Sequence, residues 1–117
     1  MGRPVLVADD SAVARAVLGR RLGALGLTVV TAASAREAGS IDPADLAAAL
    51  LDLELGDGLG TEVARRLREA APTLPIAFLS ATEDPALLDA AAHFGPVFSK
   101  SSGAAAAARW AGRAGRR

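Results

Sequence analysis

The sequence predicts an α/β fold in which helices cover both faces of a five-stranded parallel sheet. Short apolar runs alternate with helix-like segments along the whole chain, which is the order typical of such folds. Three of the five runs lack the apolar–polar alternation of a half-exposed strand, as expected for strands buried on both faces. A length of 117 residues suits one domain, so we expect a single domain over residues 1–117.

Five short apolar runs are the expected strands. Each is followed by signals for a helix, and a helical crossover is the usual connection between parallel neighbours. The runs comprise residues 5–8, 28–32, 47–51, 76–79 and 97–98.

The first two expected helices have clear start signals. Ser11 is a plausible N-cap, and apolar residues from Val13 to Leu25 then recur at helical spacing until Gly26. Residues 34–37 match a capping box, with a serine followed three positions later by a glutamate, and predict a second, short helix.

The remaining three helices complete the repeat. The third is expected to start at Thr61 and to stop before Pro72. An Asp-Pro pair at 84–85 supplies an N-cap and a first-turn proline for the fourth helix. Ser101 or Ser102 is expected to open a fifth, alanine-rich helix. Five successive strand–helix units correspond to a flavodoxin-like, doubly wound (βα)5 fold.

Composition narrows the function classes. Thirteen basic and thirteen acidic residues cancel, so the overall charge favours neither nucleic acid nor a membrane as partner. The chain has no cysteine, which excludes disulfides, thiolate metal sites and cysteine nucleophiles and agrees with a cytoplasmic location. No apolar run approaches the roughly 18 residues needed to span a bilayer. The first ten residues have the pattern of a buried strand with a polar end and lack the long apolar region of a signal peptide.

The C-terminal segment is basic. From Lys100 onward the chain carries five basic residues and no acidic one. We interpret these cations as favourable partners for the C-terminus of the last helix. A basic tail for nucleic acid or an acidic partner is the alternative interpretation.

Polar residues stand where four of the expected strands end. Asp9 and Asp10 follow the first strand, and Asp52 ends the third. Ser80 follows the fourth strand and Lys100 the fifth. Because sites in open parallel sheets lie at the carboxyl ends of the strands, these side chains are expected to meet.

The residue types fit phosphoryl transfer. Three clustered carboxylates repel one another unless a hard cation such as Mg²⁺ lies among them. Asp52 can then act as the nucleophile toward phosphorus. The transferred group carries negative charge on three oxygens, which Lys100 can neutralise and the Ser80 hydroxyl can bind.

The segments around these residues resemble the signature segments of the response-regulator receiver family. The match covers essentially the whole chain, and Gly60 also corresponds to the family's glycine before the third helix. The resembling segments are residues 5–11, 50–53, 78–81 and 98–100.

The resemblance implies specific roles. Asp52 would be the phosphoacceptor, and Asp9 and Asp10 the acid pair that binds Mg²⁺ together with Asp52. The main-chain carbonyl of Glu54 would be a further metal ligand. By the same resemblance, the remaining two pocket residues would contact the phosphoryl oxygens; these are Ser80 and Lys100.

The resemblance also implies partners. A histidine kinase or a phosphotransfer protein would supply the phosphoryl group, as in bacterial two-component systems. With a single domain expected and no DNA-binding domain, output would pass to a protein target that the sequence does not identify. No membrane contact is expected, and the oligomeric state stays open.

Several positions depart from the family pattern. Val97 stands where the family usually has an aromatic residue that reports phosphorylation. Ser101 replaces a proline that usually follows the lysine in a cis bond, so a trans bond is expected here. Gly56 and Gly58 replace a proline and a methionine after the phosphoacceptor, which should loosen that loop.

Other functions are less compatible with the sequence. A pseudo-receiver, acting as a constitutive protein-interaction module without phosphorylation, is the alternative within the same fold. Haloacid-dehalogenase-type phosphatases use similar residues, but their nucleophile motif comes first and their acid pair last, the reverse of the order here. DNA binding lacks support because no segment resembles a helix-turn-helix.

Overall fold

A computed structural model describes residues 2–115. These residues form five parallel strands and five α-helices in strict alternation, as predicted. The strands are β1 (Val5–Ala8), β2 (Val29–Ala32), β3 (Ala48–Asp52), β4 (Ile76–Ser80) and β5 (Val97–Ser99). The helices are α1 (Ala12–Ala24), α2 (Ala35–Gly39), α3 (Gly60–Ala70), α4 (Pro85–Ala92) and α5 (Ala104–Ala114), with a short 3₁₀ helix η1 (Pro43–Asp45).

The strand order is β2-β1-β3-β4-β5, and every neighbouring pair is parallel. From β1 the chain first adds β2 on one side and then crosses to β3 on the other. The order therefore reverses between β1 and β3, where doubly wound sheets place their ligands. The predicted fold class is confirmed.

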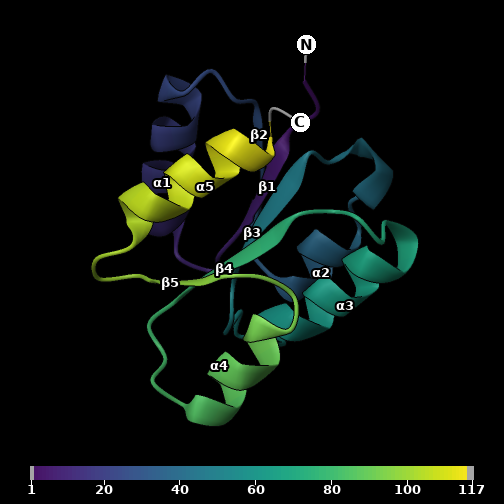
Figure 1. Cartoon of the computed structure of the whole chain (residues 1–117), viewed down its shortest axis with the longest axis vertical. Helices are drawn as coiled ribbons and strands as arrows, with labels where there is room; N and C mark the ends of the chain where they lie inside the picture. The colour runs from purple at the N-terminus through teal and green to yellow at the C-terminus, as the bar shows by residue number, and fades with distance from the viewer. Residues whose placement is uncertain (1, 116–117) are drawn as a thin grey trace.

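Helices cover both faces of the sheet (Figure 1). Helices α1 and α5 lie together on one face, and α2, α3 and α4 lie on the other. Successive strand residues alternate between the two cores: Leu6 packs with the α2–α4 layer and Val7 with the α1–α5 layer. Since both faces are buried, both sets of strand residues are apolar, which explains the continuous apolar runs.

Most of the predicted helix starts are present. The Ser11 hydroxyl accepts from the Ala14 N–H at the start of α1, and Ser34 caps α2 through the Glu37 N–H. Asp84 caps α4, with Pro85 in the first turn. Helix α3 begins at Gly60, one residue before the expected start.

The start of α5 differs from the prediction. Gly103, rather than Ser101 or Ser102, is the N-cap residue, and no side chain caps this helix. A Cβ on Gly103 would lie 2.6 Å from the Ser99 carbonyl oxygen, so the turn from β5 into α5 needs a glycine. The steric demand of that turn, rather than capping preference, decides where the helix begins.

Two further expectations concern the chain near its C-terminus. No peptide bond within residues 2–115 is cis, so the bond before Ser101 is trans as expected. Of the basic C-terminal residues, Arg109 and Arg113 are exposed on α5, whereas Arg116 and Arg117 lie outside the described residues. Among residues 2–115 no helix combines the length and apolar character required to cross a membrane.

Candidate functional site

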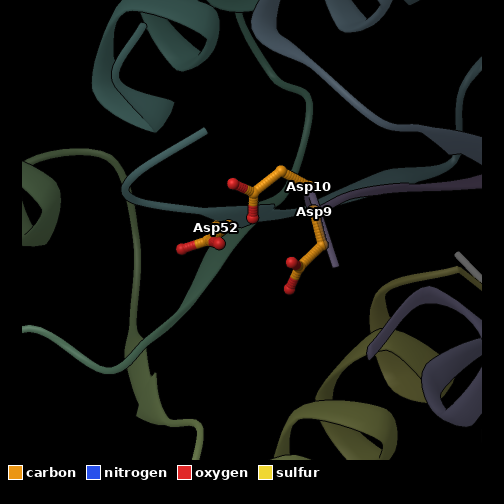
Figure 2. A group of neighbouring side chains, drawn as sticks. All are labelled: Asp9, Asp10 and Asp52. Carbon is orange, nitrogen blue, oxygen red and sulfur yellow. The ribbon is translucent and has the colours of Figure 1, made fainter. Parts of the chain in front are cut away.

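Three carboxylates converge at the carboxyl edge of the sheet (Figure 2). Strands β1 and β3 pair with Ala8 opposite Leu51, so the next residues along, Asp9 and Asp52, stand side by side. One carboxylate oxygen from each of Asp9, Asp10 and Asp52 lies within 4.8 Å of the other two. Asp9 and Asp52 are only 1% and 6% exposed, whereas Asp10 faces solvent. The structure thus brings together the three predicted acids.

Backbone groups orient the two buried carboxylates. Oδ1 of Asp9 accepts from the Ser11 N–H at 2.9 Å, and Oδ1 of Asp52 accepts from the Glu54 N–H at 3.2 Å. The Arg15 guanidinium donates to the main-chain carbonyl of Asp9 at 2.7 Å. These bonds leave the Oδ2 atom of each buried acid for other partners.

Lys100 contacts both free oxygens. Its Nζ lies 2.9 Å from Asp9 Oδ2 and 2.8 Å from Asp52 Oδ2, and its backbone N–H donates to the Ser80 carbonyl at 2.9 Å. The ammonium therefore bridges two of the three acids. One positive charge against three carboxylates leaves the pocket with an excess of negative charge when all are ionised.

The pKa values reflect this environment. Burial raises the pKa of Asp52 above its usual value, and the bonds from Lys100 and the Glu54 N–H offset this only in part. Burial lowers the pKa of Lys100, but its hydrogen bonds to Asp52 and Asp9 outweigh that effect and hold the pKa above its usual value. Lys100 is therefore a permanent cation at physiological pH, and Asp52 bears an unfavourable charge that a further cation would stabilise.

Ser80 closes the pocket on the β4 side. It is the last residue of β4 and is 4% exposed, and β4 pairs with β3 so that Leu79 stands opposite Asp52. Its Oγ accepts from the Thr82 N–H at 3.0 Å, a bond that leaves the hydroxyl hydrogen able to donate elsewhere. Thr82 Oγ1 in turn accepts from the Asp84 N–H, so short side-chain bonds connect Ser80 to the cap of α4.

The loop after Asp52 is a narrow hairpin. The Leu55 N–H donates to the Gly58 carbonyl at 3.0 Å, and Glu54 forms an antiparallel bridge with Leu59. The Glu54 side chain is exposed, while the bond from its N–H to Asp52 Oδ1 keeps its backbone beside the Asp52 carboxylate. Its proposed role as a carbonyl ligand rests on this proximity and on the resemblance.

Two positions in this segment require glycine, Gly60 because of a close contact and Gly56 because of its backbone conformation. Gly60 has no room for a Cβ, which would collide with the Asp52 main-chain carbonyl. Gly56 has φ of +81°, a conformation that favours glycine, and a Cβ there would lie 3.5 Å from Asp10 Oδ2. The backbone therefore runs directly against the acidic pocket.

The donor set fits a hard divalent cation. All three side chains offer carboxylate oxygens, the ligands that Mg²⁺ and Ca²⁺ prefer, and the exposed Asp10 leaves an open side for water and a phosphoryl oxygen. Such a cation would offset the excess negative charge of the pocket. The residues present thus fit a divalent metal, although the oxygen set does not by itself select Mg²⁺.

The β4–β5 side of the site contains a hollow. A cavity of about 750 Å³ lies between α4 and β5, and its lining includes Ser80, Leu88, Val97 and Phe98. Val97 is half-buried at the wall of this hollow. A larger side chain at this position would have space to occupy.

Sequence reasoning missed two polar residues that support the pocket. Arg15 reaches the Asp9 carbonyl from one turn inside α1, and Asp57 binds the start of α2 from the tip of the Asp52 loop. A bond between positions 57 and 35 leaves no local signature, because nothing in the spacing indicates which distant N–H group a loop carboxylate will meet.

Comparison with known proteins identifies the family of this chain. The model of the response regulator receiver domain matches residues 5–97. No curated protein sequence matches significantly. A putative response regulator from Chloroflexus aurantiacus is similar over all of both chains, with 24% identity and a TM-score of 0.84.

Two further solved structures are similar. The N-terminal domain of a three-domain response regulator/sensory box/GGDEF protein from Carboxydothermus hydrogenoformans shares 25% identity, covering 97% of this chain and 94% of the other, with a TM-score of 0.79. A response regulator from Burkholderia pseudomallei, solved with a phosphorylated aspartic acid, a calcium ion and citrate, shares 23% identity, covering 94% and 65%, with a TM-score of 0.75. With its family match spanning most of the sequence, the chain belongs to the response regulator receiver domain family of two-component systems.

Proposed function

We propose that Asp52 accepts a phosphoryl group from a histidine kinase or phosphotransfer protein, with Mg²⁺ held by the acidic pocket, and that the modified domain changes its affinity for a protein partner. The observation that carries the proposal is the cluster of Asp9, Asp10 and Asp52 at the switch point of the sheet, with Lys100 bridging two of these acids, Asp9 and Asp52. Receiver domains are regulatory modules that pair with histidine kinases, which agrees with this assignment.

The metal ligands in this proposal are the carboxylates of Asp9, Asp10 and Asp52 and the main-chain carbonyl of Glu54. When bound, Mg²⁺ would neutralise charge on the phosphoryl oxygens and favour their approach to the acids. The calcium ion and the phosphorylated aspartic acid reported for the Burkholderia protein support the same combination of groups on this fold.

Asp52 supplies the nucleophile. One of its carboxylate oxygens forms the new P–O bond while the P–N bond of the donor phosphohistidine breaks. The bonding electrons go to the histidine nitrogen, which takes up a proton. Because Asp52 Oδ1 is held by the Glu54 N–H and Oδ2 by Lys100, the carboxylate is already oriented before the donor arrives.

Lys100 and Ser80 bind the transferred group. The Lys100 ammonium lies 2.8 Å from Asp52 Oδ2, so a small movement would bring it to a phosphoryl oxygen on the same carboxylate. The Ser80 hydroxyl can donate its hydrogen to a second oxygen while still accepting from Thr82. Together they offset the negative charge that the metal does not reach.

A mass measurement tests this proposal. Incubation with a small phosphodonor and Mg²⁺ is expected to add one phosphoryl group to the intact protein. Asp52→Asn should abolish the gain, whereas Asp89→Asn, a change of the same chemistry at an exposed position on α4, should leave it unchanged. An equal gain in the Asp52 variant would contradict the assignment of the phosphoacceptor.

A pseudo-receiver is the second candidate, and the hollow beside Val97 favours it. Val97 lines that cavity where the family usually has an aromatic side chain. The chain therefore lacks the residue whose movement usually reports phosphorylation. Amide chemical shifts with Mg²⁺ and beryllofluoride separate the two candidates. Shifts at Asp52 and its neighbours support phosphorylation, and an unchanged spectrum supports a constitutive interaction module.

A further inference from the structure

Asp57 connects the phosphoacceptor loop to a helix more than twenty residues earlier in the chain. Its Oδ1 accepts from the Ala35 N–H at 2.8 Å, and its Oδ2 accepts from the Arg36 N–H at 3.1 Å. These two bonds hold the pKa of Asp57 below its usual value. Both oxygens of one carboxylate are thus used to bind the first turn of α2.

The contact is supported by close packing. A Cβ built on Gly58, the next residue along the loop, would lie 3.2 Å from the Ala35 Cβ. The loop tip therefore rests against the start of α2, and the absence of a side chain at position 58 permits this approach. The two N–H bonds and the packing contact together fix the position of the loop tip against α2.

Helix α2 already has a cap of its own. Ser34 Oγ accepts from the Glu37 N–H at 3.0 Å, and the Glu37 carboxylate accepts from the Ala33 N–H at 2.7 Å. On its inner side the helix is anchored by Ala38, which is completely buried. Because α2 is held independently of the loop, it can serve as a fixed point to which Asp57 ties the loop.

Through these bonds Asp57 holds in place the segment next to the proposed metal site. Glu54, Leu55 and Leu59 close the hairpin through backbone bonds, and Gly56 lies against Asp10. The two glycines of the tip, Gly56 and Gly58, would otherwise allow this segment many conformations. Each one that moved the Glu54 carbonyl would lower the fraction of the protein ready to bind a cation.

We propose that Asp57 is a positioning residue for the metal site: by capping α2 it holds the loop that presents the Glu54 carbonyl beside the three acids. The inference rests on the proposed function, in which that carbonyl is a metal ligand. Asp57 itself contacts no metal in this proposal and acts only through the loop.

The test measures Mg²⁺ binding directly, by isothermal titration calorimetry of the unphosphorylated chain. Asp57→Ala is expected to weaken Mg²⁺ binding about three- to tenfold, at or below the lower end of the roughly 10- to 100-fold effects seen when groups that support metal ligands are removed, because Asp57 acts through the loop backbone. Asp57→Asn keeps one oxygen that can accept one of the two N–H bonds and is expected to restore part of the affinity.

Ser34→Ala is the matched control. It removes a cap from the same helix but does not touch the loop. Lower stability with unchanged Mg²⁺ affinity is expected for this variant. Amide hydrogen exchange without metal supplies a second readout, since Ala35 and Arg36 should lose protection in Asp57→Ala.

Each contrary outcome has a distinct meaning. Equal Mg²⁺ affinity in wild type and Asp57→Ala would overturn the positioning role and leave the proposed function intact. Equal weakening by Ser34→Ala would show that only helix stability matters and would also overturn it. Failure of the wild-type chain to bind Mg²⁺ would instead contradict the proposed function, and the positioning role with it.

Discussion

The two sides of the site are built differently. On the β1–β3 side, backbone bonds, an ion-paired lysine and the Asp57 contact hold the acids and their loop, and a Cβ on Gly60 has no space. On the β4–β5 side, the wall next to Ser80 opens into a hollow of about 750 Å³. The side that carries the acids is therefore held by several independent contacts, whereas the β4–β5 side is loosely filled.

This difference indicates where the molecule can vary. Strand register alone brings Asp9 and Asp52 together, and any shift would separate them. Val97, by contrast, lines the hollow, which can accommodate a change in side-chain volume. Four substitutions, taken from the largest expected effect to the smallest, test the contrast.

Gly60→Ala should be the most damaging. The added methyl meets the Asp52 main-chain carbonyl, which cannot move without disturbing β3. We expect a loss of about 3 kcal/mol of unfolding free energy, measured by urea denaturation. Gly19→Ala is the control, since nothing lies within 4 Å of a Cβ there, and it should stabilise α1 by about 0.5 kcal/mol. Similar values for both would contradict the close packing inferred at Gly60.

Lys100→Met should mainly affect chemistry. It keeps an apolar side chain of similar length but removes the charge that bridges Asp9 and Asp52. We expect phosphorylation by a small phosphodonor to slow about 100-fold, as when one donor to a developing negative charge is removed. Arg109→Met, at an exposed position on α5, controls for loss of a positive charge. A rate within a factor of two of wild type would exclude Lys100 from the reaction.

Asp52→Asn should stabilise the unphosphorylated protein. Burial raises the pKa of Asp52, so the folded state binds this proton more tightly than the unfolded chain does. The ionised group therefore opposes folding above that raised pKa, and the opposition disappears as pH falls through it. We expect a gain in unfolding free energy at neutral pH that shrinks toward acidic pH. Urea titrations at several pH values measure this; a gain independent of pH would mean that charge is not its cause.

Val97→Phe should be nearly neutral. The hollow beside Val97 can accept the larger side chain, in contrast to the single methyl that Gly60 excludes. We expect a change within about 1 kcal/mol in unfolding free energy. A crystal structure or the thermal midpoint checks it, and a loss as large as that of Gly60→Ala would show that both sides of the site are equally tightly packed.

Local signals account for most of what could be predicted. Continuous apolar runs identified five strands, and the caps at Ser11, Ser34 and Asp84 identified helix starts, because periodicity and capping involve residues only a few positions apart. Parallel strands whose carboxyl ends meet at one edge then brought the three acids and Lys100 together, as expected.

Other features depended on the folded chain. The cap of α5 moved from a serine to Gly103 because the turn leaves no space for a side chain. Glycines 56 and 58, expected to loosen the loop, belong to a segment that Asp57 fastens to α2. The hollow beside Val97 depends on how α4 lies over β5.

The sequence by itself determined the order of elements, the burial of both sheet faces and the identity of the acidic pocket. These follow from periodicity and from residues that end consecutive strands. The tertiary structure alone decided that Lys100 bridges Asp9 and Asp52, and that Asp57 reaches across to the first turn of α2. The physical reason is that such bonds join residues 21 to 91 positions apart, so their partners are set by strand register and loop path rather than by neighbours in the chain.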